Sequence, residues 1–288
     1  MKATLLFLFV FTLGYSQNPD TTNVFDLGYA VENNWLHLEV TGYENSTHYT
    51  KPLQAKFTNT SKKPLRFSIP NGQLFRAEDS TVQDIVIVKE ELIALKVGET
   101  KELPLYGMCI ELSNSGNNLE TKFYLDGKAE EKLLKLTQEI EKRKDFNTLG
   151  QYAVWTLTDD EDLTSISGFD ESEALHLKTF VANLLGVPIP LHDPNDYTTN
   201  YHNDGLIKRA AKSKFKFTFS EDSAVSIAMF DENNMVVREL YNNPNVKAGY
   251  HELDFKFDVS VYQNKAYYVR MIVDGEIKIN MKMEPRRS

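Results

Sequence analysis

Histidine and carboxylate side chains gather in one proline-rich stretch of the chain, where they could hold a divalent ion. Imidazole nitrogen and carboxylate oxygen are both common ligands of metal ions. The candidate ligands are His192, Asp193, Asp196, His202 and Asp204. Their spacing matches neither a helical His-x-x-x-His pair nor a calcium-binding loop. The alternative interpretation is therefore a hydrated, turn-rich loop.

A run of four acidic residues, Asp159-Asp160-Glu161-Asp162, offers the paired carboxylates that acid and base catalysis uses. Consecutive charges more often form a solvated turn. The sequence contains no nucleophile elbow, P-loop or dinucleotide-binding fingerprint. We therefore predict a protein that is not an enzyme and needs no cofactor. An accessory module, or an extracellular hydrolase that uses the acidic run, is the alternative.

Length and composition are those of a folded protein of about two domains. The chain has 288 residues, of which 41% are hydrophobic and 25% charged. These proportions exclude a disordered chain, a collagen and a coiled coil. The net charge of −9 argues against an electrostatic interaction with nucleic acid or anionic lipid.

The N-terminus has the pattern of a secretory signal peptide. Lys2 precedes a short apolar run from Leu5 to Leu13, and small and polar residues follow. We assign residues 1–16 to the signal peptide, with cleavage near Ser16, and expect a secreted or cell-surface protein. No other apolar run approaches the roughly 20 residues of a membrane-spanning helix. Cys109 is the only cysteine, so no intrachain disulfide can form.

Apolar and polar residues alternate through residues 17–112, as they do in half-buried antiparallel strands. Leu36, Leu38 and Val40 share one face of such a strand. The run from Ile85 to Val88 is apolar throughout, which is typical of a strand covered on both sides. Short strands with frequent turns predict an immunoglobulin-like β-sandwich.

The period changes to that of helices in residues 113–186. Apolar positions recur at helical spacing over residues 129–144, 149–157 and 172–185. Asp170 and Ser172 are alternative N-caps of the third helix, and Gly186 ends it. Residues 187–213 follow, rich in proline, and are expected to form a linker or long loop.

Strand periodicity returns in residues 214–288. Phe215, Phe217 and Phe219 alternate with polar residues, and Asp274-Gly275 marks a hairpin with a type I′ turn. The predicted fold is thus mainly β with a small helical insert: two immunoglobulin-like β-sandwiches flank a short α-helical region.

The C-terminal block contains the sequences VSIAMFDENNMVVREL and VKAGYHELDF, followed by AYYVRMIVDGEIKINMKM. It resembles the immunoglobulin-like modules that end bacterial proteins exported by the type IX secretion system, and also flagellar hook-cap domains. The resemblance implies an immunoglobulin-like fold and a role in secretion sorting. The polar turn of this chain ends in Asn234, where the modules usually have glycine.

A second resemblance covers the segments YGMCIE, Tyr106–Glu111, and LGQYAVWTLTDD, Leu149–Asp160. Together they resemble the thioester domains of bacterial surface adhesins. The resemblance implies that Cys109 supplies the thiol and Gln151 the amide of an internal thioester. The residues that match the flanking motif are Ala153, Trp155, Thr158 and Asp159. Gly150 stands where the family usually has threonine.

Two interpretations of this pair remain open. In a thioester, the thiolate attacks the Gln carboxamide and expels ammonia, which leaves a bond that reacts with amines. In the other interpretation, Trp155 belongs to a helix core, Gln151 is a capping or solvated side chain, and Cys109 fills a strand position. We accordingly expect a non-enzymatic binding or adhesion protein whose partner is an extracellular protein or a glycan. Attachment to the outer cell surface fits this interpretation. A covalent thioester adhesin is the alternative.

Overall fold

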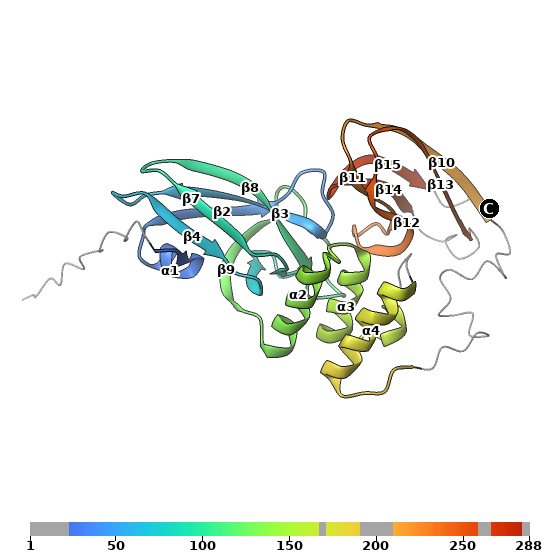
Figure 1. The fold of residues 1–288 in the computed structure, drawn as a ribbon, viewed down its shortest axis with the longest axis horizontal. Helices are drawn as coiled ribbons and strands as arrows, with labels where there is room; N and C mark the ends of the chain where they lie inside the picture. Colours follow the sequence, from blue (N-terminus) through green and yellow to red (C-terminus); the bar gives the residue numbers. More distant parts are fainter. Residues whose placement is uncertain (1–22, 167–170, 191–209, 259–265, 284–288) are drawn as a thin grey trace, which may run out of the picture.

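The computed structural model describes residues 23–166, 171–190, 210–258 and 266–283. The predicted signal peptide lies outside the described residues, as does Asp170. The described part is mainly β, with two groups of strands, one group of helices and a short helix that lies apart from that group (Figure 1). None of the described helices is both long enough and apolar enough to cross a membrane.

Six strands of the N-terminal half close into a barrel. Their inward side chains, such as Leu53, Phe57 and Phe75, are completely buried. In order around the barrel the strands are β2 (Leu36–Gly42), β3 (Tyr49–Asn59), β8 (Thr100–Cys109), β6 (Ile85–Ile87), β5 (Gln73–Ala77) and β9 (Lys122–Lys128). The barrel replaces the open sandwich expected for residues 17–112.

The difference arises from β9, which follows the expected end of the sandwich and falls in the range predicted to be helical. β9 pairs with β2 through Val40↔Phe123 and with β5 through Arg76↔Tyr124. It therefore joins two strands that would otherwise be sheet edges, and closure removes those edges.

A smaller sheet and a short helix lie beside the barrel. Their core residues Leu65 and Phe67 are buried in the same hydrophobic cluster as the barrel interior. The elements are β1 (Phe25–Asp26), α1 (Leu27–Glu32), β4 (Leu65–Ile69) and β7 (Glu91–Leu95), with the strand order β1-β4-β7.

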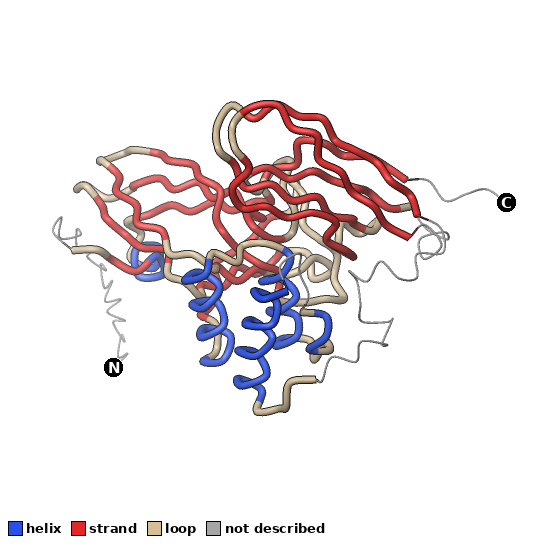
Figure 2. Tube along the Cα trace, turned by 45° about the vertical axis from the view of Figure 1, so that its right-hand side comes forward, coloured by secondary structure: helices blue, strands red, loops and turns tan. Residues whose placement is uncertain are grey.

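The three predicted helices are present and pack as a group against one side of the barrel (Figure 2). Lys144 ends the first of them in a left-handed conformation, with φ of 63°. Gly186, with φ of 75°, follows the last. The helical elements are α2 (Glu131–Arg143), α3 (Thr148–Thr158), the 3-10 turn η1 (Leu163–Ser165) and α4 (Glu171–Leu185).

The C-terminal part consists of two sheets that enclose a second hydrophobic core, and we call it the C-terminal sandwich. Phe215 and Phe255 of one sheet and Ile227 and Met271 of the other are buried in that core. One sheet pairs β10 (Ala210–Phe219) with β13 (Gly249–Asp258). The other has the order β12 (Val236–Val246), β11 (Ser223–Phe230), β14 (Tyr267–Val273) and β15 (Glu276–Met283).

The predicted hairpin between β14 and β15 is confirmed. Asp274 and Gly275 have φ of 50° and 88°, and a type I′ turn requires positive φ at both central residues.

The C-terminal sandwich shares a core with the rest of the molecule. One face of its four-stranded sheet belongs to the same cluster as the barrel and the helices, and we call this contact the junction. The sandwich contributes Ala228, Phe230, Met235, Val236 and Ile272. Buried apolar area stabilises such a contact, so the sandwich is docked on the barrel and the helices.

Candidate functional site

The structure brings Cys109 and Gln151 together where α3 packs against the last residue of β8. The backbone N–H of Cys109 donates to Oε1 of Gln151 over 3.0 Å. The side-chain amide of Gln151 donates in turn to the carbonyl oxygen of Cys109 over 2.8 Å. Both residues are completely buried, so the two hydrogen bonds form away from water.

The end of a neighbouring strand explains why this position requires an amide. β3 pairs with β8 only as far as Tyr49↔Met108. The N–H and carbonyl of Cys109 would therefore lack a partner on that side, and a buried backbone group without a partner is costly. The side chain of Gln151 supplies one acceptor and one donor, as a further strand residue would. It is held in place by the first turn of α3, which Asn147 caps.

The thiol of Cys109 is protonated and points toward His48, the residue just before β3. Its Sγ donates to the carbonyl oxygen of His48 over 3.0 Å. Burial raises the pKa of the Cys109 thiol well above its ordinary value, and the charges of Glu111 and Asp84 raise it further. The resting thiol is therefore a weak nucleophile.

His48 connects this pair to the C-terminal sandwich. Its Nε2 accepts a hydrogen bond from the N–H of Val236 over 2.9 Å, so the neutral ring carries its proton on Nδ1. The ring stacks on Trp155, with centroids 5.4 Å apart. Nδ1 is buried and has no hydrogen-bond partner among the residues that the structure describes. Burial, together with the charge of Arg270, lowers the pKa of His48 to about 3.

The backbone of Cys109 holds both polar atoms of the Gln151 amide, and its N–H polarises the side-chain carbonyl. The Sγ of the same cysteine is hydrogen-bonded to the carbonyl oxygen of His48. A donor such as the Cys109 N–H stabilises the negative charge that develops on oxygen when a nucleophile adds to the carbonyl carbon.

The four flanking residues of the motif divide into two pairs. Ala153 and Trp155 are completely buried on α3, and the ring of Trp155 stacks on His48. Thr158 and Asp159 are exposed at the end of α3, where the hydroxyl of Thr158 bonds to Val154 and to Asp159. Trp155 thus packs beside the site through His48, whereas the exposed pair lies at the end of the helix.

Close packing explains the glycine at position 150. A Cβ atom there would lie 2.2 Å from the carbonyl oxygen of Asp145 and 2.6 Å from Cε of Met108. We expect Gly150→Ala to lower the free energy of unfolding by about 3 kcal/mol, the upper end of the usual range for overpacking, as measured by urea denaturation.

Gly127→Ala is the matched control, because a Cβ at Gly127 would meet no atom within 4 Å. An equal loss of stability in both variants would contradict the close approach of α3 to Met108.

The acidic run does not form a site in the part of the chain described here. Asp162 caps η1 by accepting from the N–H and hydroxyl of Thr164, and these bonds hold its pKa below the ordinary value. A general acid needs the opposite shift. Asp159 and Asp160 are exposed. The structure thus gives the hydrolase interpretation no support.

The candidate metal ligands His192, Asp193, Asp196, His202 and Asp204 all lie outside the described residues. Among the residues that are described, no group of three or more His, Cys, Asp or Glu side chains could hold a metal ion.

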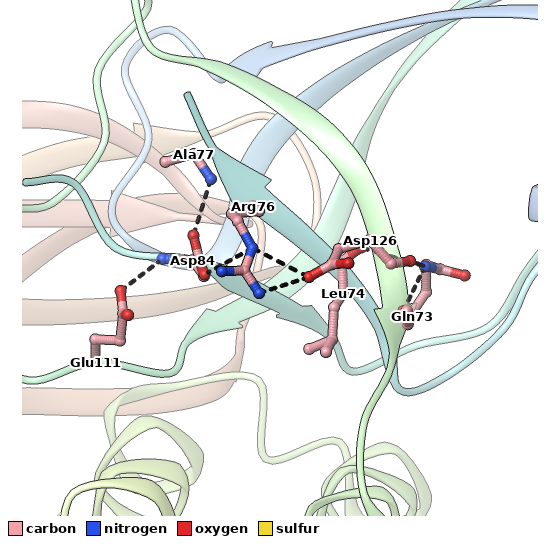
Figure 3. A network of polar contacts seen from close by, with 8 residues as sticks. Gln73, Leu74, Arg76, Ala77, Asp84, Glu111 and Asp126 are labelled. Atoms are coloured by element: carbon pink, nitrogen blue, oxygen red, sulfur yellow. Dashed lines mark hydrogen bonds and ion pairs between the residues drawn. The ribbon is translucent and has the colours of Figure 1, made fainter. Parts of the chain in front are cut away.

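Sequence reasoning missed a charged network on the outside of the barrel (Figure 3). Arg76 binds Asp126 over 2.7 Å and lies 3.8 Å from Asp84. Desolvation, together with nearby Glu111, raises the pKa of Asp84. The network joins β5, β9 and the segment before β6, so only the pairing of β9 could have revealed it.

Sequence reasoning also missed His48, because its importance depends on residues about 60, 110 and 190 positions away. No family model and no curated protein matches the chain.

Proposed function

We propose that this protein acts outside the cell or at its surface by binding a partner, without catalysing a reaction. One observation supports the proposal: the amide of Gln151 and the thiol of Cys109 are both buried, and both form hydrogen bonds within the protein. The partner class is an extracellular protein or a glycan, in agreement with the signal-peptide pattern.

A specific observation favours a second, covalent form of this function. The two residues that the thioester resemblance singles out are direct neighbours. In the thioester, Sγ of Cys109 bonds to the side-chain carbonyl carbon of Gln151. The C–N bond breaks, and the thiol proton leaves with the nitrogen as ammonia.

The thioester would then act on a primary amine of the partner. The amine nitrogen bonds to the carbonyl carbon, the C–S bond breaks, and the amine proton passes to sulfur. Burial protects the thioester from water until then. The product is an amide between the partner and the side chain of position 151, with Cys109 again a free thiol.

Intact mass measurement tests the covalent form. We expect the mature protein to be lighter by one ammonia, and expect Cys109→Ala to have its full mass. Peptide mapping must place the loss at Gln151, because a new N-terminal glutamine also loses ammonia. A full mass at Cys109 and Gln151 in the native protein would contradict the thioester.

Retention on cells tests binding itself and separates the two forms. Labelled protein is incubated with cells and washed first in buffer and then in denaturant. Retention through the buffer wash alone supports noncovalent binding, and retention through both washes supports covalent binding. Loss of the protein in the first wash would contradict both.

For the C-terminal sandwich we propose an immunoglobulin-like fold and a role in secretion sorting. Two sheets around one core, together with the sequence resemblance, support this assignment. Fusion of residues 210–288 to a reporter tests the sorting role, and a reporter that is exported equally well without the fusion would contradict it.

A further inference from the structure

The C-terminal sandwich contacts the residues next to the Cys109–Gln151 pair. Phe230 of β11 packs against the rings of His48 and Tyr49, each with centroids 6.2 Å from its own. The N–H of Val236, at the start of β12, bonds to the ring of His48. His48 in turn accepts the thiol hydrogen bond of Cys109. His48 therefore connects the sandwich to the sulfur of Cys109.

The edge of the junction is polar, and hydrogen bonds cross it there. The hydroxyl of Tyr43 donates to Glu276 over 2.9 Å, and that of Ser46 lies 3.1 Å from the carbonyl oxygen of Gly275. Ser46 and Glu276 also form an isolated antiparallel bridge. An apolar centre with a polar edge is typical of contacts between domains that can separate.

Backbone strain lies in the same part of the junction. Thr50 has φ of 66°, a left-handed conformation that is rare for a β-branched residue. Its hydroxyl bonds to the carbonyl oxygen of Phe146 over 2.6 Å. The turn of the β14–β15 hairpin packs closely against Thr50, because a Cβ at Gly275 would lie 3.0 Å from Cγ2 of Thr50. Such strain persists only where the surrounding structure holds it, and separation of the junction would remove one of these constraints.

We propose that the C-terminal sandwich is a cover over the Cys109–Gln151 pair, and that separation at the junction is the step that admits an attacking amine. This inference rests on the covalent function proposed above. The sandwich then determines when the buried pair can react, because Phe230 and Val236 hold His48, whose carbonyl oxygen accepts the thiol hydrogen bond of Cys109.

Native-state labelling of Cys109 in the full chain tests the cover. Tyr43→Phe removes the edge hydrogen bond to Glu276, and we expect an alkylating agent to modify Cys109 roughly five- to tenfold faster, the effect of one lost hydrogen bond on an opening equilibrium. If intact mass shows a thioester, the rate of mass gain with methylamine replaces the labelling rate.

Two control variants distinguish separation at the junction from other kinds of opening. Tyr250→Phe removes a matching hydrogen bond, from Tyr250 to Glu252 over 2.9 Å on the outer sheet of the sandwich, and should leave the rate unchanged. Ile93→Val weakens the core beside the barrel without touching the junction, and should also leave it unchanged.

The outcomes separate the cover from the thioester. Acceleration by Tyr43→Phe alone supports the cover, whether the measured reaction is thiol labelling or amine addition. Equal acceleration by Ile93→Val would mean that Cys109 reacts only after global unfolding, and would overturn the inference. A full native mass would contradict the thioester while leaving the labelling result to decide on the cover.

Discussion

Gln151→Leu is expected to lower the free energy of unfolding by about 2–6 kcal/mol. The substitution leaves the N–H and the carbonyl of Cys109 buried without their side-chain partner. Each buried polar group that loses its partner costs about 1–3 kcal/mol. Leucine has a similar volume, so the loss reports on hydrogen bonding more than on packing. Urea denaturation at neutral pH measures it.

Two controls define the cause of that loss. Gln138→Leu, on the exposed side of α2, should change stability by less than about 0.5 kcal/mol. Cys109→Ala keeps both hydrogen bonds of Gln151 and should cost less than half as much as Gln151→Leu. If the two substitutions cost the same, a covalent link would account for the stability in place of the hydrogen bonds.

The stability of the protein is expected to fall as the pH is lowered from about 6.5 toward 3, because His48 is buried in its neutral form. Its pKa is about 3 in the folded state, against an ordinary value of 6.5. Between these values the unfolded chain binds a proton that the folded chain does not, so acid favours unfolding. From pH 7 to pH 4.5 this amounts to about 2.5–3 kcal/mol.

The positive charge of Arg270 acts on His48 in the same direction as burial. Arg270, on β14, lowers the pKa of the imidazole, and a charged ring would also lose the hydrogen bond from Val236. Tyr49 is neutral in this pH range, because burial raises its pKa far above the ordinary value. The carboxylate of Glu239 on β12, which is buried and accepts a hydrogen bond from Thr148, also raises the pKa of Tyr49.

His48→Gln tests this assignment, because glutamine can still accept from Val236 but does not titrate. The variant should lose about 2.5–3 kcal/mol less than the parent protein when the pH falls from 7 to 4.5. His37→Gln is the control, because the side chain of His37 is mostly exposed. An unchanged pH dependence in His48→Gln would show that other groups cause acid unfolding.

Local patterns were enough to predict three of the helices and the last hairpin, but not the short helix α1, which lies in a range predicted to form strands. Helical spacing identified α2, α3 and α4, and Asp274-Gly275 identified the type I′ turn, because both signals depend only on neighbouring residues. Barrel closure was not predictable in this way. It depends on β9 pairing with two strands that are distant in sequence, and alternation looks the same in a sandwich and in a barrel.

The candidate site was predictable only in part. Motif resemblance pointed to Cys109 and Gln151, which are neighbours in the structure. The roles of His48, Val236 and Phe230 follow from the junction, and no local spacing signals a contact between residues 188 positions apart.

The junction also determines the order in which the molecule can be completed. His48 and Val236 are 188 positions apart, and Tyr43 and Glu276 are 233 apart. Contacts of such long range form slowly, because a large loop must close first. Because the chain is synthesised from its N-terminus, the barrel strands and the helices are available for folding well before β14 and β15 are synthesised. The surface around His48 and Tyr49 is therefore exposed to solvent until the last strands pack against it. The N-terminal half thus completes its packing only when the C-terminal strands have been synthesised.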